Sequence, residues 1–318
     1  MQWTAIVNPA AGRGRTRKLL PELHAACAAS ALDIDLQVPT SAEHGHTLAR
    51  QAFAAGRGVL ACGGDGTVGE LAGIAAETDG LLALVPSGSG NDFARHLGFD
   101  VGNPLDSFAV LEAGRIARVD LGRAWAGGRS PHEAPTWFCT VASTGFDAAA
   151  NEWANGVQRL RGTTLYIVAM LRTLATYKPR RFLLTVDGEA HMIESWLVAV
   201  GNSRSYGGGM RVTPNAALDD GMLDVIAVGP VSRARFLRTF PQVFKGGHVD
   251  RDEVQTWRGR LVEIESIEAG EGALELYASG DSAGALPARL EGTRGALRMV
   301  VPALAPVPDA EPLAGPPT

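Results

Sequence analysis

The stretch GGDGT, residues Gly63 to Thr67, decides how this chain folds and raises the first question about its function. It follows a short apolar run, Gly58 to Cys62, and precedes a run of helical character, Val68 to Ala76. Glycines between a strand and a helix let main-chain N–H groups approach an anion, and the helix start adds a favourable partial charge. Phosphate loops usually carry a lysine, whereas this loop carries Asp65. A carboxylate is useful beside phosphates when a magnesium ion lies between them, which predicts a magnesium–nucleotide site.

Strand-like and helix-like runs alternate around this loop through the first third of the chain. The strand-like runs are Thr4–Val7, Leu32–Val38, Val59–Cys62 and Leu81–Val85, and the helix-like runs are Arg13–Ser30, Ala42–Ala55, Val68–Ala76, Asp92–Leu97 and Asp106–Ala113. This alternation predicts a three-layer α/β domain with a mainly parallel sheet, over residues 1–120. Ligands of such sheets bind beyond the carboxyl ends of the strands, where the glycine loops fall.

The pattern changes from about Val119, where strand-like runs follow one another and glycine-rich turns separate many of them. These runs are Trp137–Ala142, Arg181–Val186, Ile193–Val200, Leu223–Val228, Leu261–Glu265, Leu274–Ala278 and Ala288–Leu290, with helix-like runs at Asp147–Arg159, Thr164–Thr176 and Ser232–Phe244. They predict a mainly antiparallel β-sandwich domain over residues 121–304. Leu297–Val301 reads as a last strand that either domain could hold. Five prolines among residues 305–318 predict a disordered tail.

Composition narrows the class of protein. The formal net charge of −5 over 318 residues argues against a protein that binds nucleic acid through a broad basic face. The three cysteines have no paired spacing, so neither a disulfide framework nor a zinc site is predicted. The first residues lack the basic and apolar regions of a signal peptide, and no uncharged apolar run reaches the roughly 18 residues that span a bilayer. The sequence therefore predicts a soluble, cytoplasmic protein.

Three glycine-bearing loops lie at predicted strand ends of the first domain. They are Asn8–Gly12, Gly63–Thr67 and Ser87–Asp92. The lysine-bearing P-loop pattern and the dinucleotide fingerprint are both absent from the sequence. A single glycine at a strand end is usually only a turn, but three such loops in one α/β domain favour a shared anion site.

Several longer motifs accompany these loops. Pro86–Arg95 reads PSGSGNDFAR, Thr40–His46 reads TSAEHGH, and the later stretches Gly201–Met210 and Pro214–Asp224 read GNSRSYGGGM and PNAALDDGMLD. Together with GGDGT, the first two resemble the diacylglycerol kinase catalytic domain family, and the later two resemble the second domain of the bacterial soluble lipid kinases. The resemblance runs from about Ala5 to Val301, nearly the whole chain.

The combination is more specific than any one motif. GGDG is shared with NAD kinases and phosphofructokinases, whereas the Asn91-Asp92-Phe93 and GGGM motifs are not expected in them. The resemblance implies a first domain of the NAD kinase and phosphofructokinase type, followed by an antiparallel β-sandwich.

The resemblance also implies roles for individual residues. Nucleotide contacts would come from Asn8, Gly12, Thr40, Gly63, Gly64, Asp65, Gly66, Thr67, Ser89 and Asn91. Asp65 and Asp92 would organise the catalytic magnesium. A second, structural cation would be held by the side chain of Asp220 and the main-chain carbonyls of Ala217 and Met222. Without the resemblance, the acidic residues around Gly221 read as a turn.

The family's general base is the glutamate of an Asp-Gly-Glu motif shortly before a Leu-Pro pair. Here Ser279-Gly280-Asp281 precedes Leu286-Pro287, so Asp281 matches the base. Aspartate is one methylene shorter than glutamate, and the serine removes a neighbouring negative charge that could raise the pKa of the base. Two smaller departures are Ser89 in place of a threonine and Gly69 in place of an asparagine. Without the resemblance, a solvated turn aspartate is the simpler interpretation of Asp281.

These observations predict a two-domain lipid kinase that uses ATP and Mg²⁺ and phosphorylates a lipid hydroxyl, diacylglycerol to phosphatidic acid first of all. Catalysis would rest on Asp281 and Asp65, and the protein would contact the inner membrane face peripherally. A sphingoid base or phosphatidylglycerol remains open as the acceptor, and a homodimer remains open as the assembly. The departures at Ser279 and Asp281 also leave open a non-catalytic nucleotide-binding regulator.

Overall fold

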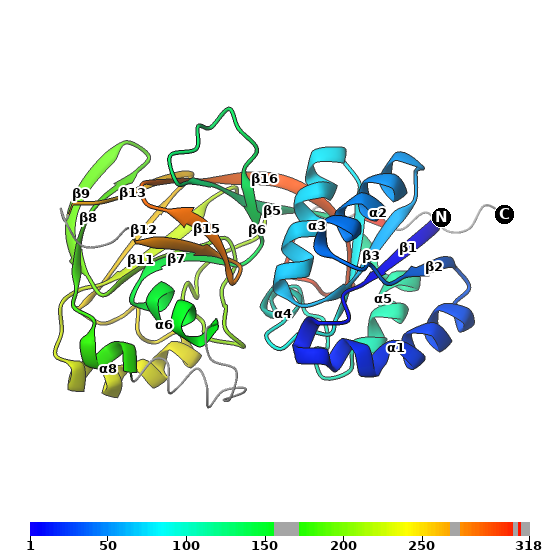
Figure 1. Cartoon of the computed structure of the whole chain (residues 1–318), viewed down its shortest axis with the longest axis horizontal. Helices are drawn as coiled ribbons and strands as arrows, with labels where there is room; N and C mark the ends of the chain where they lie inside the picture. The colour runs from blue at the N-terminus through cyan, green and yellow to red at the C-terminus, as the bar shows by residue number, and fades with distance from the viewer. Residues whose placement is uncertain (156–171, 268–273, 308–310, 313–318) are drawn as a thin grey trace.

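The computed structural model describes residues 1–155, 172–267, 274–307 and 311–312, and it forms two lobes (Figure 1). Helices flank the short strands of the N-terminal lobe, whereas strands dominate the C-terminal lobe. Two long strands, β5 (Arg115–Ala126) and β16 (Ala288–Val301), run between the lobes. No helix in the described ranges is long and apolar enough to cross a bilayer.

The N-terminal lobe is a parallel sheet covered on both faces. Its strands are β1 (Gln2–Val7), β2 (Asp33–Gln37), β3 (Gly58–Gly63) and β4 (Leu81–Pro86), in the order β2-β1-β3-β4. Two helices, α2 (Ala42–Ala54) and α3 (Asp65–Thr78), pack on one face, while α1 (Ala11–Ala29) and α5 (Ser107–Ala113) pack on the other. The three-layer α/β prediction is confirmed.

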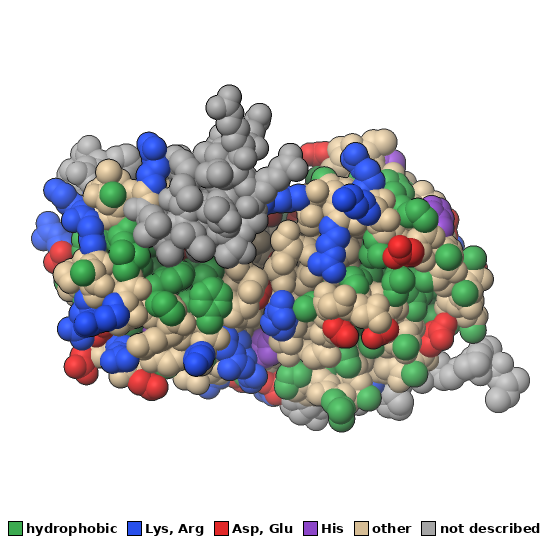
Figure 2. Space-filling model, turned by 90° about the horizontal axis from the view of Figure 1, so that it is seen from below, with side chains coloured by type: hydrophobic (Ala, Val, Ile, Leu, Met, Phe, Trp, Pro, Cys, Tyr) green, Lys and Arg blue, Asp and Glu red, His purple; other side chains and the backbone are tan. Residues whose placement is uncertain are grey.

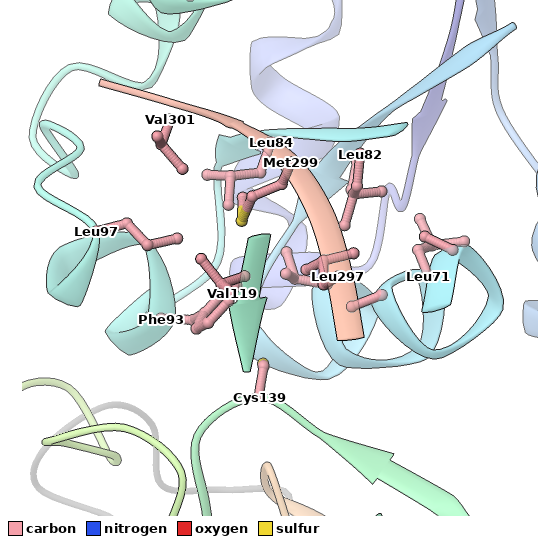
Figure 3. Packing of buried hydrophobic residues seen from close by; sticks show 14 of the residues in the cluster. Leu71, Leu82, Leu84, Phe93, Leu97, Val119, Cys139, Leu297, Met299 and Val301 are labelled. Carbon is pink, nitrogen blue, oxygen red and sulfur yellow. The ribbon is translucent and has the colours of Figure 1, made fainter. Parts of the chain in front are cut away.

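The sequence folds this way because β3 and β4 are apolar throughout. Every residue of both strands is buried, as a strand between two helical layers requires. Figure 3 shows one of the two resulting cores, in which Leu71 of α3 packs with Leu82 and Leu84 of β4 and with Met299 of β16. Two short elements, α4 (Asp92–His96) and η1 (Pro104–Asp106), complete the lobe.

One long strand replaces the two short ones that the sequence predicts at 288–290 and 297–301. β16 pairs with β5 along most of its length, with an irregularity between Thr293 and Leu297. Its last part extends the first sheet, where Arg298 and Met299 pair in parallel with Leu81 and Leu82. The prediction of two separate strands was wrong. Polar residues interrupt the apolar pattern in the middle of β16, but the strand continues through them because it pairs with β5, a segment far away in the sequence.

The C-terminal lobe consists of two packed antiparallel layers. Six strands form one sheet in the order β12-β11-β10-β7-β14-β15. These are β7 (Val141–Gly145), β10 (Leu197–Gly201), β11 (Leu223–Val228), β12 (Val254–Gly259), β14 (Glu275–Ala278) and β15 (Asp281–Ala285). The facing layer contains β5, β16, β6 (Thr136–Phe138), β8 (Arg180–Val186), β9 (Glu189–Ser195) and β13 (Leu261–Ser266). Both layers contribute to one buried core, which confirms the predicted sandwich.

The apolar run Ile193–Val200, predicted as one strand, belongs to two. It divides between β9 in one layer and β10 in the other, and the buried Trp196 lies at the crossing. The main-chain N–H of Trp196 donates to the carbonyl of Val228, and the Trp196 carbonyl accepts from the main-chain N–H of Phe146. The prediction of one strand was wrong because the chain remains apolar where it passes from one sheet to the other, so its composition does not mark the boundary between the two strands.

Helices outside the sandwich also differ from the prediction. The run Ser232–Phe244 forms α8 (Arg233–Thr239) and then a 3₁₀ helix, η2 (Phe240–Lys245). Pro241 near the start of η2 has no N–H to continue the α-helical ladder, which explains the change. The helix predicted at Asp147–Arg159 is present as α6 (Phe146–Asn155), which follows β7, and residues 156–159 lie outside the described residues. Most of the helix predicted at Thr164–Thr176 also lies outside the described residues, while residues 172–176 are helical.

The first residues of the proline-rich tail have defined contacts. Ala305 and Val307 are buried in the core of the N-terminal lobe. The Arg115 guanidinium donates to the carbonyls of residues 303, 305 and 307, and Glu311 pairs with Ile116. The prediction of disorder is therefore wrong for residues 305–307, which burial and these hydrogen bonds hold in place, while residues 308–310 and 313–318 lie outside the described residues.

Candidate active site

The three glycine loops meet at the carboxyl ends of β1, β3 and β4. A β-carbon on Gly88 would lie 2.3 Å from the α-carbon of Gly64, so the second and third loops touch backbone to backbone. Gly12 has a φ of 58°, and a β-carbon there would lie 2.7 Å from the Ser87 carbonyl oxygen. Side chains at these positions would force the loops apart, which explains why all three are glycines.

A cavity of about 370 Å³ opens between the first two loops and α3. Asn8, Thr40 and Thr67 all line it. The Asn8 Nδ2 donates to Thr67 Oγ1 over 2.8 Å, and Asn8 Oδ1 accepts from the Ala10 N–H over 3.0 Å. The structure thus brings these three predicted nucleotide-binding residues to one cavity.

The third loop is held by its own asparagine. Asn91 is buried with a φ of 53°, its Oδ1 accepts from the Gly88 N–H, and its Nδ2 donates to the carbonyls of Pro86 and Gly88. Its polar atoms are thereby directed to the loop backbone, where they shape the loop. Ser89, at the tip of the same loop, is exposed.

Asp65 and Asp92 approach each other beside this loop. A β-carbon on Gly90 would lie 3.0 Å from Asp65 Oδ2 and 2.9 Å from Asp92 Oδ2, so both carboxylates flank the same point. Asp65 Oδ1 accepts from the Phe93 N–H over 3.0 Å. The Asp92 oxygens accept from the N–H groups of Gly208 and Gly209, each over 2.7 Å. The GGGM loop of the second domain is therefore hydrogen-bonded to Asp92, a predicted magnesium ligand of the first domain.

The electrostatics of this pair fit a divalent cation. Burial, and then the neighbouring Asp92 carboxylate, raise the pKa of Asp65 to about 6. Two adjacent carboxylates repel each other when both are ionised, and a cation between them would remove that repulsion. Carboxylate oxygens are also the ligands that Mg²⁺ prefers. The donors present at Asp65 and Asp92 thus suit this ion.

Asp281 reaches the first domain from the tip of the β14–β15 hairpin. Ser279 and Gly280 form the turn with φ values of 50° and 99°. The Ser279 Oγ accepts from the N–H groups of Cys139 and Thr140, each over 3.3 Å, which ties the hairpin to the segment between β6 and β7. A β-carbon on Gly66 would lie 2.9 Å from Asp281 Oδ2. The hairpin therefore places the Asp281 carboxylate against the GGDGT loop.

The surroundings of Asp281 strengthen it as a base. Desolvation, and then the nearby Glu70 carboxylate, raise the pKa of Asp281. A carboxylate accepts a proton more readily as its pKa rises. Its side chain remains open to solvent, as a group that meets a substrate requires.

The predicted structural-cation residues lie elsewhere. Asp220 Oδ1 accepts from the Met222 N–H over 2.9 Å, while Asp220 Oδ2 pairs with the Arg258 guanidinium. Arg258 Nε also forms an ion pair over 3.5 Å with Asp224 Oδ2, a buried oxygen. No hydrogen bond or ion pair in the described ranges joins this loop, or Ala217 in it, to Asp65 or Asp281. In this structure the Arg258 guanidinium thus occupies the Asp220 oxygen that the predicted cation would need.

A structural role for Asp120 was not predicted from the sequence. This fully buried carboxylate accepts from the Gly221 N–H over 2.5 Å and from the Gly295 N–H over 2.7 Å. It thereby joins β5, β16 and the loop that contains Asp220. Its signal in the sequence was an isolated acid within the apolar run Val119–Leu121, which alone does not reveal its partners.

His248 and the apolar cavity that it lines were not predicted from the sequence either. The cavity lies between the six-stranded sheet and the α8–η2 segment, with Phe146, Leu197, Met210, Ile226 and Phe236 among its apolar walls. The His248 Nε2–H donates to the Val212 carbonyl over 2.9 Å, while its buried Nδ1 has no hydrogen-bond partner among the described residues. Only the folded sheet assembles these walls, because they come from distant parts of the chain.

Known families match both halves of this architecture. The diacylglycerol kinase catalytic domain matches residues 2–124, and the YegS C-terminal NAD kinase beta sandwich-like domain matches residues 140–301. A diacylglycerol kinase of Mycobacterium tuberculosis is 36% identical over 301 residues, which cover 94% of each chain. One from Bacillus subtilis is 23% identical, over 93% of this chain and 95% of the relative.

Solved structures show the same fold. The crystal structure of a diacylglycerol kinase from Bacillus anthracis aligns with a TM-score of 0.65 at 22% identity, over 94% of this chain and 96% of that one. The chain therefore belongs to the bacterial diacylglycerol kinase and YegS-like lipid kinase family, and as a kinase of this family it uses ATP.

Proposed function

We propose that this chain transfers the γ-phosphate of ATP to the hydroxyl of diacylglycerol and so forms phosphatidic acid. The relative from Mycobacterium tuberculosis, a diacylglycerol kinase, supports this acceptor. The observation that carries the proposal is the placement of Asp281 against Gly66, because it joins a base from the second domain to the nucleotide loop of the first. Phosphoryl transfer requires positioning, charge neutralisation and a carboxylate near the attacking hydroxyl.

Each loop has a distinct task in this proposal. Asn8, Thr40 and Thr67 border the cavity for the nucleoside part of ATP, while the glycine loops direct their N–H groups to the phosphates. Asp281 accepts the proton of the lipid hydroxyl as that oxygen attacks the γ-phosphorus, and the bond from that phosphorus to ADP, the leaving group, breaks. Asp65 and Asp92 would hold Mg²⁺, which would neutralise charge on the phosphate oxygens.

The apolar cavity beneath α8 is where we place an acyl chain of the acceptor. Most of its walls are apolar, with Asp147, His248, Arg251 and Glu253 among its polar lining residues. The loop that carries Tyr206 and Met210 also lines it. That same loop donates from Gly208 and Gly209 to Asp92. A chain seated there would thus lie one loop away from the carboxylates that organise the reaction.

The setting of the reaction belongs to the same proposal. A membrane lipid and cytoplasmic ATP meet at the inner membrane face, so we place the protein there as a peripheral enzyme. The monomer holds both Asp65 and Asp281, so a homodimer is not needed to complete the site. A second, structural cation would sit at Asp220 with the carbonyls of Ala217 and Met222, where it would replace the Arg258 guanidinium as the partner of Asp220.

A direct assay tests the function. Purified protein is incubated with labelled ATP, with and without Mg²⁺, and with diacylglycerol, a sphingoid base or phosphatidylglycerol in parallel. We expect labelled phosphatidic acid that depends on Mg²⁺, and an acceptor preference for diacylglycerol. Phosphorylation of another lipid alone would replace the acceptor, and binding of ATP without transfer to any lipid would support a non-catalytic regulator instead.

A further inference from the structure

The α8–η2 segment, residues 233–245, has two faces of different character. Phe236, Phe240 and Val243 point inward and line the apolar cavity. Leu237 and Phe244 lie outside this inward set, and 39% and 50% of their surfaces are exposed. The inward residues are four and three positions apart and the two exposed ones are seven apart, so each set recurs on one side of the helical segment.

Cations accompany the exposed apolar residues. Arg238 and Lys245 follow Leu237 and Phe244 directly, and both are exposed. Neither forms an ion pair in the part of the chain that the structure describes, whereas Arg235 on the same helix pairs with Glu253. Figure 2 views the face that carries α8, where hydrophobic side chains gather on that half of the molecule and Lys and Arg side chains border them.

We propose that α8–η2 is the element that docks the protein on an anionic lipid bilayer. Leu237 and Phe244 would enter the acyl boundary, and Arg238 and Lys245 would meet the phosphate headgroups. A helix that carries apolar and cationic residues together on its outer face has the character of an interfacial helix. The protein's net charge of −5 opposes adsorption to an anionic surface, so these cations must act locally.

The position of the segment gives the docking a purpose, and this step rests on the proposed lipid acceptor. One layer of side chains separates the bilayer-facing side of α8–η2 from the cavity, because Phe236 and Phe240 line that cavity. Docking would therefore hold the cavity at the membrane surface, and an acyl chain could enter it without crossing water.

Vesicle co-sedimentation without nucleotide tests the docking apart from catalysis. The vesicles contain phosphatidylcholine alone or an equal mixture with phosphatidylglycerol. We expect the unmodified protein to bind the mixture, and to lose binding as salt rises. The double variant Arg238→Gln/Lys245→Gln should weaken binding by roughly 25-fold, since each cation contributes about 5-fold. Leu237→Ser/Phe244→Ser should weaken it by about 10-fold.

Matched variants separate docking from a general defect. Arg238→Lys/Lys245→Arg keeps both charges and should bind as the unmodified protein does. Met192→Ser removes an exposed side chain of β9, 67% of which is accessible, and should also leave binding unchanged. Equal binding by all variants, or equal binding to both kinds of vesicle, would overturn the proposal. So would a change from dimer to monomer in the α8–η2 variants by light scattering, which would assign this face to a second copy.

An activity measurement keeps the two proposals distinct. With a short-chain diacylglycerol dissolved as monomers, the α8–η2 variants should keep the kcat/KM of the unmodified protein, whereas with vesicle-borne diacylglycerol their apparent KM should rise. Loss of activity on both substrates would contradict a docking role. If the protein binds vesicles as expected but phosphorylates no lipid, the docking proposal stands and the proposed phosphorylation of diacylglycerol is contradicted.

Discussion

The carboxylate of Asp281 lies against Gly66, so close that a β-carbon at residue 66 would come within 2.9 Å of Asp281 Oδ2. The two residues are more than two hundred positions apart and belong to different lobes. Their contact depends on the turn at Ser279 and Gly280 and on the anchoring of Ser279 to the chain before β7. Any change that moves the hairpin should therefore change catalysis before it changes nucleotide binding.

Replacement of Asp281 by asparagine should abolish lipid phosphorylation. The amide cannot accept the hydroxyl proton, and loss of a general base costs roughly 10²- to 10⁴-fold in rate. Because Asp281 lies outside the cavity lined by Asn8 and Thr40, the affinity for Mg-ATP measured by calorimetry should change little. Asp281→Glu keeps a carboxylate and should retain more activity than Asp281→Asn. A fully active Asp281→Asn variant would remove this residue as the base.

Gly66→Ala should lower kcat while it leaves the fold intact. The added methyl group would meet the end of the Asp281 side chain, which can rotate away from it, so the cost falls on the position of the carboxylate. We expect a loss of about 10- to 100-fold in kcat with a small change in melting temperature. Gly247→Ala is the matched control, because no atom lies within 4 Å of a β-carbon there. Equal kcat values for the two variants would contradict the contact.

Much of this site was predictable from local sequence. The loops at Asn8–Gly12, Gly63–Thr67 and Ser87–Asp92 each follow an apolar strand, and parallel strands bring their carboxyl ends to one edge of a sheet. The place of Asp65 beside Asp92 follows from that geometry. The all-apolar strands β3 and β4 likewise predicted a sheet covered on both faces.

What could not be predicted depends on contacts between distant segments. The two strands predicted at 288–290 and 297–301 are one strand because β16 pairs with β5. The burial of the Asp120 carboxylate is explained only by the N–H groups of residues 221 and 295, which donate to it. The crossing at Trp196 keeps the composition of a continuous strand although the chain changes layers. The apolar cavity has walls from α6, β10, β11 and α8, none of which marks a cavity on its own.

Ser279→Ala should destabilise the hairpin and reduce activity together. It leaves the N–H groups of Cys139 and Thr140 without their acceptor, at a cost of about 1 to 3 kcal/mol in the free energy of unfolding. Ser279→Asp restores an acceptor and the motif of the family, so it should recover kcat more than alanine does. Chemical denaturation and steady-state kinetics measure both effects. An alanine variant with normal stability and kcat would show that the anchor is dispensable.

The buried histidine of α4 should make stability depend on pH. Burial, and then Arg204 and Arg211, lower the pKa of His96 to about 4, and its Nδ1 accepts from the Arg204 N–H over 3.4 Å. The unfolded chain binds a proton at this residue below about pH 6.5, whereas the folded protein binds it only near pH 4. The contribution of neutral His96 is therefore fully present above pH 6.5 and is lost as pH falls toward 4.

The resulting change should approach about 3 kcal/mol in the free energy of unfolding between pH 7.5 and 4, since one pKa unit corresponds to about 1.4 kcal/mol. His96→Asn keeps an acceptor for the Arg204 N–H and removes the titration, so its stability relative to the unmodified protein should rise across this interval. Urea denaturation at several pH values measures the difference, and His132→Asn, at an exposed position, is the control. Parallel pH profiles for the unmodified protein and His96→Asn would show that His96 is protonated in the fold, and that Arg204 and Arg211 do not hold it neutral.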